Sequence, residues 1–209
     1  MFDTSTLLTY LVASIAIILA PGPAQALVLA RSISDGKISG ILTGVGLNVG
    51  TIVHAIAAAL GLSAILATSA VAFATVKYLG AAYLFYLGSK ALRTKDYHAT
   101  LTQSPSGSWH QAFTKAVITG ILNPKVALFF LAFLPQFVDP RHGSVFFQFL
   151  LLGIILAVID MVYESVLALV AGTFSGWFTG NPGFAVWRRR VTGTVLVGLG
   201  FRLAVTERA

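Results

Sequence analysis

Long apolar runs separated by short polar segments make up most of this chain. A membrane-spanning helix needs about 20 predominantly apolar residues, and six stretches provide that length. They cover roughly residues 6–32, 40–67, 71–92, 111–134, 144–174 and 186–205. A polar linker at about 93–110 separates the third stretch from the fourth. The pattern predicts an all-α membrane protein with six transmembrane helices in a single membrane domain, residues 1–209.

Proline interrupts two of these stretches near their centres. The first break is Pro21-Gly22-Pro23 and the second is Asn123-Pro124-Lys125. Proline in a helix interior removes a backbone donor and clashes with the preceding turn, so we expect free carbonyls at Ile17, Leu19 and Gly120. Inside lipid, such backbone is tolerated only where it is buried in protein or lines a cavity. The two breaks therefore predict a cavity within the membrane domain.

The breaks occupy matching positions in the two halves of the chain. Each half, about 1–95 and about 111–209, contains three predicted helices, and proline breaks the first helix of each. Because three is an odd number, the second half enters the membrane in the opposite orientation. Broken helices at corresponding positions of inverted repeats indicate a transporter binding site near the bilayer midplane. The layout thus predicts two inverted three-helix repeats around one site.

Composition supports a membrane protein and places its charges. The 209 residues are 56% hydrophobic and only 10% charged, against about 25% charged in soluble domains. The net charge of +7 is explained by loop lysines and arginines, so we predict no nucleic-acid partner. Nine lysines and arginines fall on one side of the predicted membrane domain, namely Arg31, Lys37, Lys90, Arg93, Lys95, Lys115 and Arg188–Arg190. Four fall on the other side, namely Lys77, Arg141, Arg202 and Arg208. The positive-inside rule places the nine-charge side in the cytoplasm and both termini outside.

Two carboxylic acids lie in the middle of the fifth predicted helix. Asp160 and Glu164 are four residues apart and therefore share one helix face. Their mutual repulsion and loss of hydration favour a proton on at least one of them, which suits a proton-coupled carrier. A structural pair neutralised by lysine or arginine is the alternative interpretation.

Two basic residues, Lys125 and His54, lie deep inside predicted spans, and a third, Arg31, lies near a span end. Lys125 follows the second break, at the start of a half-helix, where the helix dipole disfavours a cation. It therefore needs a nearby anion, and the candidates are Asp160, Glu164 or a substrate carboxylate. His54, inside the second predicted helix, either takes part in proton or substrate binding or only donates a hydrogen bond to a neighbour. At its position Arg31 is interpreted as an interfacial anchor.

Glycines recur every four residues along the second predicted helix. Small residues at this spacing let helices approach closely in lipid, so we predict helix packing here and no nucleotide site. The helix also permits a homodimer. The residues concerned are Gly36, Gly40, Gly44, Gly46 and Gly50.

The broken helix ends indicate the class of substrate. Backbone N–H groups after Pro23 and after Pro124 favour an anion, whereas freed carbonyls favour a cation such as an ammonium group. A small zwitterion satisfies both demands, which points to an amino acid.

An ordered set of motifs resembles the LysE/RhtB-type amino-acid exporter family over nearly the whole chain. The motifs are Ala20-Pro21-Gly22-Pro23, Gly36-x-x-x-Gly40, Gly46-x-x-x-Gly50, Val53-His54, Gly61-Leu62, Asn123-Pro124-Lys125 with Phe129-Phe130, and Pro135-Gln136-Phe137. The resemblance implies a bacterial inner-membrane protein that exports amino acids such as lysine, homoserine, threonine or leucine by using the proton motive force. The family's two breaks map onto Pro21-Gly22-Pro23 and Asn123-Pro124-Lys125, and its membrane aspartate maps onto Asp160; Glu164 is an additional acid. From the broken helix ends we expect the substrate to bind at these two breaks.

The sequence thus predicts an amino-acid exporter that works by proton antiport and alternating access, without a cofactor or metal. A passive pore or a metal-ion exporter is one alternative, although the chain has no cysteine and two methionines, where soft metal sites need such ligands. An intramembrane enzyme that uses Asp160, Glu164 and His54 is another. The chain contains neither H-E-x-x-H nor G-x-S-x-G, so no enzyme activity is predicted.

Overall fold

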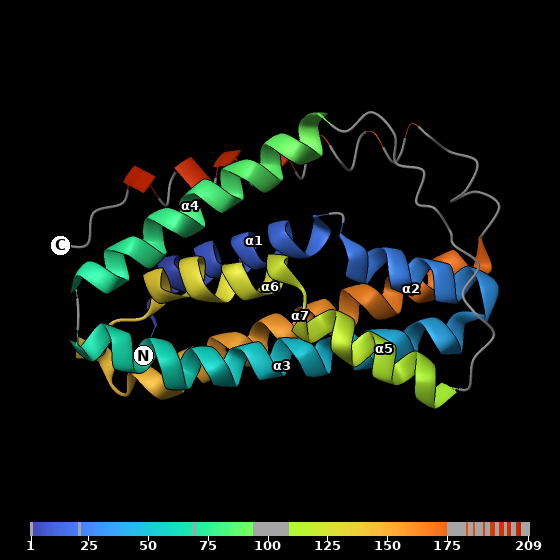
Figure 1. Ribbon diagram of the computed structural model, residues 1–209, viewed down its shortest axis with the longest axis horizontal. Helices are drawn as coiled ribbons and strands as arrows, with labels where there is room; N and C mark the ends of the chain where they lie inside the picture. Colours follow the sequence, from blue (N-terminus) through green and yellow to red (C-terminus); the bar gives the residue numbers. More distant parts are fainter. Residues whose placement is uncertain are drawn as a thin grey trace.

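The computed structural model describes residues 2–20, 22–68, 70–93 and 109–174, together with isolated positions between 183 and 205. This part of the chain contains helices and no strands, which confirms the predicted all-α class (Figure 1). Pro21, nearly all of the predicted linker at 93–110 and most of the predicted helix at 186–205 lie outside the described residues.

Seven α-helices lie in the described part of the chain, and the connection between α4 and α5 lies outside it. The α-helices are α1 (Thr4–Leu19), α2 (Pro23–Ser34), α3 (Lys37–Thr68), α4 (Ala70–Arg93), α5 (Trp109–Ile121), α6 (Pro124–Leu128) and α7 (Val145–Thr173). After α6 the chain continues as a π-helix, η1 (Phe129–Phe133), and two 3₁₀ segments, η2 (Leu134–Phe137) and η3 (Pro140–His142). In Figure 1, α1 and α2 lie end to end, α6 runs beside α1, and α3 and α7 extend along the molecule.

Three described segments are long and apolar enough to cross a membrane. They are Lys37–Ser63, Trp109–Phe137 and Val145–Thr173, and α1 with α2 makes a fourth if the pair is one span bent by 59°. These segments coincide with four of the six predicted spans. Together with the apolar surface described next, they make this a multi-pass membrane protein.

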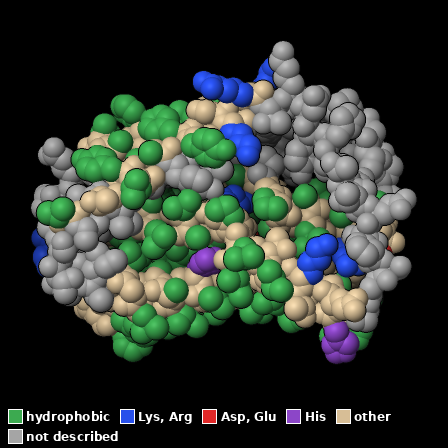
Figure 2. All heavy atoms as spheres, viewed as in Figure 1, with side chains coloured by type: hydrophobic (Ala, Val, Ile, Leu, Met, Phe, Trp, Pro, Cys, Tyr) green, Lys and Arg blue, Asp and Glu red, His purple; other side chains and the backbone are tan. Residues whose placement is uncertain are grey.

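The surfaces of α3 and α7 explain why these helices suit lipid. Large apolar side chains are exposed every three or four residues along both helices, which forms one stripe on each. The stripes are Ile38, Leu42, Val45, Val49, Val53, Ile56 and Leu60 on α3, and Phe147, Leu151, Ile154, Val158, Val162, Val166 and Leu169 on α7. Figure 2 shows hydrophobic side chains spread over the described part of one face of the molecule.

Both predicted helix breaks are present. The first helix stops at Leu19 and resumes at Pro23, and the second stops at Ile121 and resumes at Pro124. Each proline occupies the start of the new helix, where its missing N–H would have no helical partner. Asn123 caps α6, because its side-chain oxygen accepts the backbone N–H of Lys125 at 3.1 Å.

The expectation of free carbonyls is wrong at Ile17 and at Gly120. The carbonyl of Ile17 accepts the backbone N–H of Ala20, and the carbonyl of Gly120 accepts that of Asn123, each at 3.2 Å. Tighter turns at the helix ends therefore satisfy these groups. The carbonyls that accept side chains at the first break are instead those of Ile18 and Ala20.

The π-helix η1, which follows the second break, packs in the protein interior. Phe129, Phe130 and Phe133 are all buried, and the Phe129 and Phe133 rings lie 5.2 Å apart. The Tyr10 hydroxyl of α1 lies in the same cluster and donates to the Leu152 carbonyl of α7 at 2.6 Å. Pro135 supplies no N–H to the preceding turn, which is consistent with the change from π to 3₁₀ geometry. This packing fixes α6 against α1 and α7.

Glycines bring α3 close to its neighbours, as predicted. A Cβ on Gly50 would lie 2.3 Å from the carbonyl carbon of Gly120 on α5, and one on Gly120 would lie 2.4 Å from the Leu47 carbonyl oxygen. A Cβ on Gly40 would overlap Ser32 of α2. Gly36 differs from this pattern, because nothing lies near it and its φ of 86° places it in the turn before α3. Its role is conformational.

A polar loop joins η2 to α7 outside the spans. The buried Gln148 side chain accepts the Asp139 N–H and donates to the Asp139 and Gly143 carbonyls, which holds the loop against α7. The Arg141 guanidinium donates to the Asp139 carboxylate at 3.1 Å and keeps the pKa of Asp139 low, at about 2. This loop is therefore charged and water-facing at neutral pH.

Candidate functional site

A narrow pocket lies where the two helix breaks meet. Its walls come from α1, α2, α3, α6, η1 and α7, and its interior admits little more than a water molecule. The polar lining residues are Gln25, Thr51, Asn123, Lys125, Asp160 and Glu164, and the apolar ones are Ile17, Ile18, Ala24, Val126, Phe129 and Leu156. Four of the nine residues that the sequence singled out therefore line one pocket, namely Asn123, Lys125, Asp160 and Glu164.

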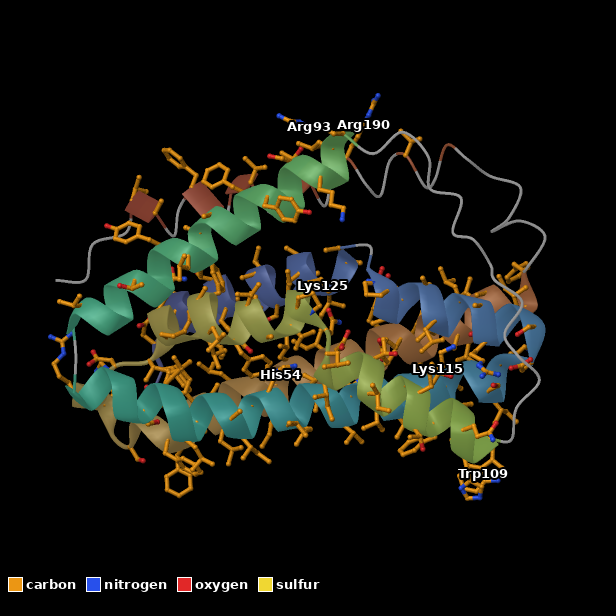
Figure 3. The ribbon with its side chains drawn as sticks, in the orientation of Figure 1. His54, Arg93, Trp109, Lys115, Lys125 and Arg190 are labelled. Carbon is orange, nitrogen blue, oxygen red and sulfur yellow. The ribbon has the colours of Figure 1, made fainter. Side chains whose placement is uncertain are left out.

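Lys125 connects the second break to the first. Its Nζ donates to the Ala20 carbonyl at 2.9 Å, and a Cβ placed on Gly22 would lie 3.8 Å from that Nζ. Figure 3 shows Lys125 at the start of α6, next to the end of α1. Ala20 is the C-terminal cap of α1, and the negative end of a helix dipole stabilises a cation. The α1 terminus thus supplies part of the compensation that this buried lysine needs.

The two helix starts differ in how many of their first N–H groups are already used. Gly22 caps α2 without a side-chain hydrogen bond, so the first N–H groups of this 12-residue helix have no side-chain partner there. At α6, in contrast, Asn123 already accepts the Lys125 N–H, and the helix has five residues. Anion binding after Pro23 and after Pro124 stays a prediction, and at α6 one of the N–H groups is already used by Asn123.

The two acids of α7 face the pocket from the opposite side. Glu164 is 1% exposed, and its Oε2 accepts the Asn48 amide at 3.0 Å. Gly44 makes room for it, since a Cβ there would lie 3.2 Å from Glu164. Asp160 is half-buried and lines the same pocket as Lys125. The arrangement fits both the proton-coupling interpretation and that of a pair neutralised by lysine.

The remaining predicted ionisable residues lie elsewhere. Among the described residues His54 does not line this pocket; it is half-buried on α3, with its ring stacked on Phe130 at 6.2 Å (Figure 3). Its Nε2 is buried without a hydrogen-bond partner among the described residues. Arg31 pairs with Asp35 at the C-terminal end of α2, which fits the predicted anchor.

Sequence reasoning missed three uncharged polar residues at the site. Gln25 and Thr51 line the pocket, and Asn48 binds Glu164 behind it. All three are buried. Each is a hydrogen-bonding side chain within an apolar stretch, a signal that a search confined to ionisable residues overlooks.

Comparisons with known proteins agree with this architecture. Residues 15–207 match the family model of the LysE type translocators. A membrane protein of Pseudomonas aeruginosa is 36% identical over 201 residues, which cover 94% of this chain and 93% of the relative. The leucine efflux protein of Salmonella typhimurium is 33% identical over 203 residues, 95% of this chain and 94% of that protein. No solved structure matches the chain. The chain therefore belongs to the LysE type translocator family.

Proposed function

We propose that this protein exports amino acids from the cytoplasm in exchange for protons. The observation that carries the proposal is the juxtaposition in one pocket of Lys125 and the uncapped start of α2 with the two acids of α7. Lys125 and the start of α2 favour a carboxylate. The two acids, Asp160 and Glu164, favour an ammonium group or a proton. An α-amino acid presents both charges on neighbouring atoms, which fits the opposed groups.

The apolar part of the pocket supports a substrate with an aliphatic side chain. Ile17, Ile18, Val126, Phe129 and Leu156 form its apolar walls. A relative that is 33% identical over 95% of this chain is named a leucine efflux protein. We therefore place leucine and similar neutral amino acids first among the candidate substrates.

Competition at Asp160 provides a route to antiport. The carboxylate binds the substrate ammonium when ionised and loses that attraction when it takes a proton from the outside. Outward movement of the substrate and inward movement of a proton then alternate at the Asp160 carboxyl group. Glu164, held by Asn48, is the second proton site, and His54 remains a candidate away from the pocket.

The pocket is narrow, and in this proposal it belongs to a closed state of the carrier. Substrate entry requires the helices around the breaks to move, and Pro21-Gly22-Pro23 and Asn123-Pro124 are the proposed hinges. The whole chain, residues 1–209, forms one domain of six spans in two inverted repeats in the bacterial inner membrane, with both termini outside. The nine lysines and arginines that the sequence predicts on one side of the spans support one positively charged cytoplasmic side.

An efflux panel tests the proposed function. Cells that produce the protein are loaded with labelled leucine, isoleucine, threonine, homoserine, lysine or arginine, and efflux is compared with cells that lack it. We expect faster efflux of at least one neutral amino acid, and slower efflux after the proton gradient is collapsed with an ionophore. Efflux of none of these amino acids would overturn the proposal.

Replacing Asp160 by asparagine tests the coupling. Asparagine keeps the shape of the side chain but holds neither a charge nor an exchangeable proton at neutral pH. In proteoliposomes we expect Asp160→Asn to lose substrate accumulation driven by an imposed pH gradient. Asp35→Asn, outside the pocket at the end of α2, is the matched control and should retain it. Wild-type accumulation by Asp160→Asn would contradict the assignment.

A further inference from the structure

Gln25 holds an unused hydrogen-bond acceptor at the pocket. Its side chain is 2% exposed, lines the pocket, and comes from the first turn of α2. The amide Nε2 donates to the Ile18 carbonyl across the first helix break. The amide Oε1 is buried and has no hydrogen-bond partner among the described residues.

A buried acceptor without a partner costs free energy, about 1–3 kcal/mol for an uncharged group. The bond to Ile18 fixes which end of the amide carries the donors, because a carbonyl can accept only from the nitrogen. Because the Gln25 amide nitrogen bonds to the Ile18 carbonyl of α1, the amide oxygen stays available as an acceptor at the pocket that Gln25 lines. A ligand with N–H groups in this pocket would satisfy that oxygen.

We propose that the Gln25 side-chain oxygen binds the α-ammonium group of the substrate and so selects amino acids over carboxylic acids that lack the amine. This inference rests on the proposed function and adds a specificity-determining residue to it. Gln25 stands beside Ala24 at the uncapped start of α2, where the substrate carboxylate is proposed to bind. The two charged groups of an α-amino acid are joined through one carbon, so a carboxylate at this helix start places its ammonium within reach of the same turn.

The role differs from that of Asp160. An amide does not titrate, so the Gln25 oxygen accepts a hydrogen bond whether or not the neighbouring acids hold protons. Gln25 therefore determines which molecules bind, whereas Asp160 determines whether a proton moves with them. Loss of the oxygen should change selectivity and leave the proton coupling intact.

The test compares an amino acid with the same molecule without its amine. The probes are the amino acid best exported in the panel and its deaminated analogue; for leucine the analogue is 4-methylpentanoate. Dissociation constants are measured on purified wild type and on Gln25→Met, which keeps the length of the side chain but removes the amide. Gln136→Met is the matched control, because the Gln136 amide also donates to carbonyls, those of Ala132 and Phe133, but outside this pocket.

We expect Gln25→Met to weaken binding of the amino acid about tenfold. Binding of the deaminated analogue should change less than twofold, and the number of protons moved per substrate should stay as in wild type. Gln136→Met should leave the ratio of the two affinities unchanged. Equal weakening of both probes by Gln25→Met would show a structural role and overturn the inference.

A second variant covers the case in which Gln25→Met does not reach the membrane. Gln25→Glu retains acceptor oxygens but loses the donor to Ile18, so it should still prefer the amino acid over the deaminated analogue. Loss of that preference would overturn the inference while leaving amino-acid export in place. If wild type binds no amino acid, the proposed function fails and this inference fails with it.

Discussion

Replacing Lys125 by methionine should reduce export per protein molecule at least about 100-fold. Lys125 lies at the pocket with its Nζ on the Ala20 carbonyl. In the proposed mechanism its removal deprives the substrate carboxylate of a cation, and it removes a positive charge from the pocket that the acids of α7 also line. Leaving a buried charged group without its hydrogen-bonding partner costs about 3 kcal/mol or more. Because about 1.4 kcal/mol is a factor of ten, the expected loss is at least about a hundredfold. The measurement is initial efflux of the best substrate, normalised to the amount of protein in the membrane.

Lys115→Met is the matched control for Lys125. Lys115 is exposed on α5, in the helix that precedes the second break, and its loss should leave efflux within about twofold of wild type. Lys125→Arg should restore part of the activity, because it keeps the charge but changes its shape and reach. Wild-type efflux by Lys125→Met would exclude this lysine from the substrate site. Equal losses in both lysine variants would indicate a general effect of positive charge.

Replacing Gly120 by alanine should destabilise the fold strongly. The new Cβ would lie 2.4 Å from the backbone oxygen of Leu47, whereas carbon–oxygen contacts are about 3.3–3.6 Å. Backbone cannot rotate away as a side chain can, so α5 must separate from α3 by about 1 Å. Overpacking of this kind costs up to about 3 kcal/mol, or a melting temperature about 6–12 °C lower for a chain of this length. The measurement is thermal unfolding of the purified protein in detergent.

Gly61→Ala provides the control on α3 itself. Nothing lies within 4 Å of a Cβ at this position, and alanine is favoured over glycine in a helix by about 1 kcal/mol. Its melting temperature should therefore equal or exceed that of wild type. Gly50→Ala, on the other side of the crossing with Gly120, should behave as Gly120→Ala does. Unchanged stability of both would show that α3 and α5 do not pack as closely as described.

The helices and their breaks followed from local sequence. Long apolar runs define the spans, and a proline inside such a run must interrupt the helix because it removes an N–H. Both observed breaks lie at the predicted residues, Pro21-Gly22-Pro23 and Asn123-Pro124. Four of the spans also coincide with helical segments able to cross a membrane, if α1 and α2 count as one span. The inverted repeat and the six-span count stay predictions.

The hydrogen bonds at the breaks did not follow from local sequence. Proline rules show which N–H is missing, but not which group will use a carbonyl once the chain has turned. Ile17 and Gly120 are satisfied by nearby backbone, whereas Ile18 and Ala20 accept Gln25 and Lys125. The last of these bonds joins residues 105 positions apart, and no helical periodicity could have specified it.

Sequence alone therefore determined that this protein is helical, membrane-embedded and broken twice by proline, since each of these properties depends on residue type and near neighbours. It also determined which ionisable residues enter the membrane, because their positions within apolar runs are visible directly. Only the tertiary structure decided that Lys125 lies on the end of α1, that Gln25 faces the pocket with an unused oxygen, and that His54 stays outside it. Those facts depend on how α1, α2, α6 and α7 pack together, and side-chain orientation across helices is set by contacts between distant parts of the chain.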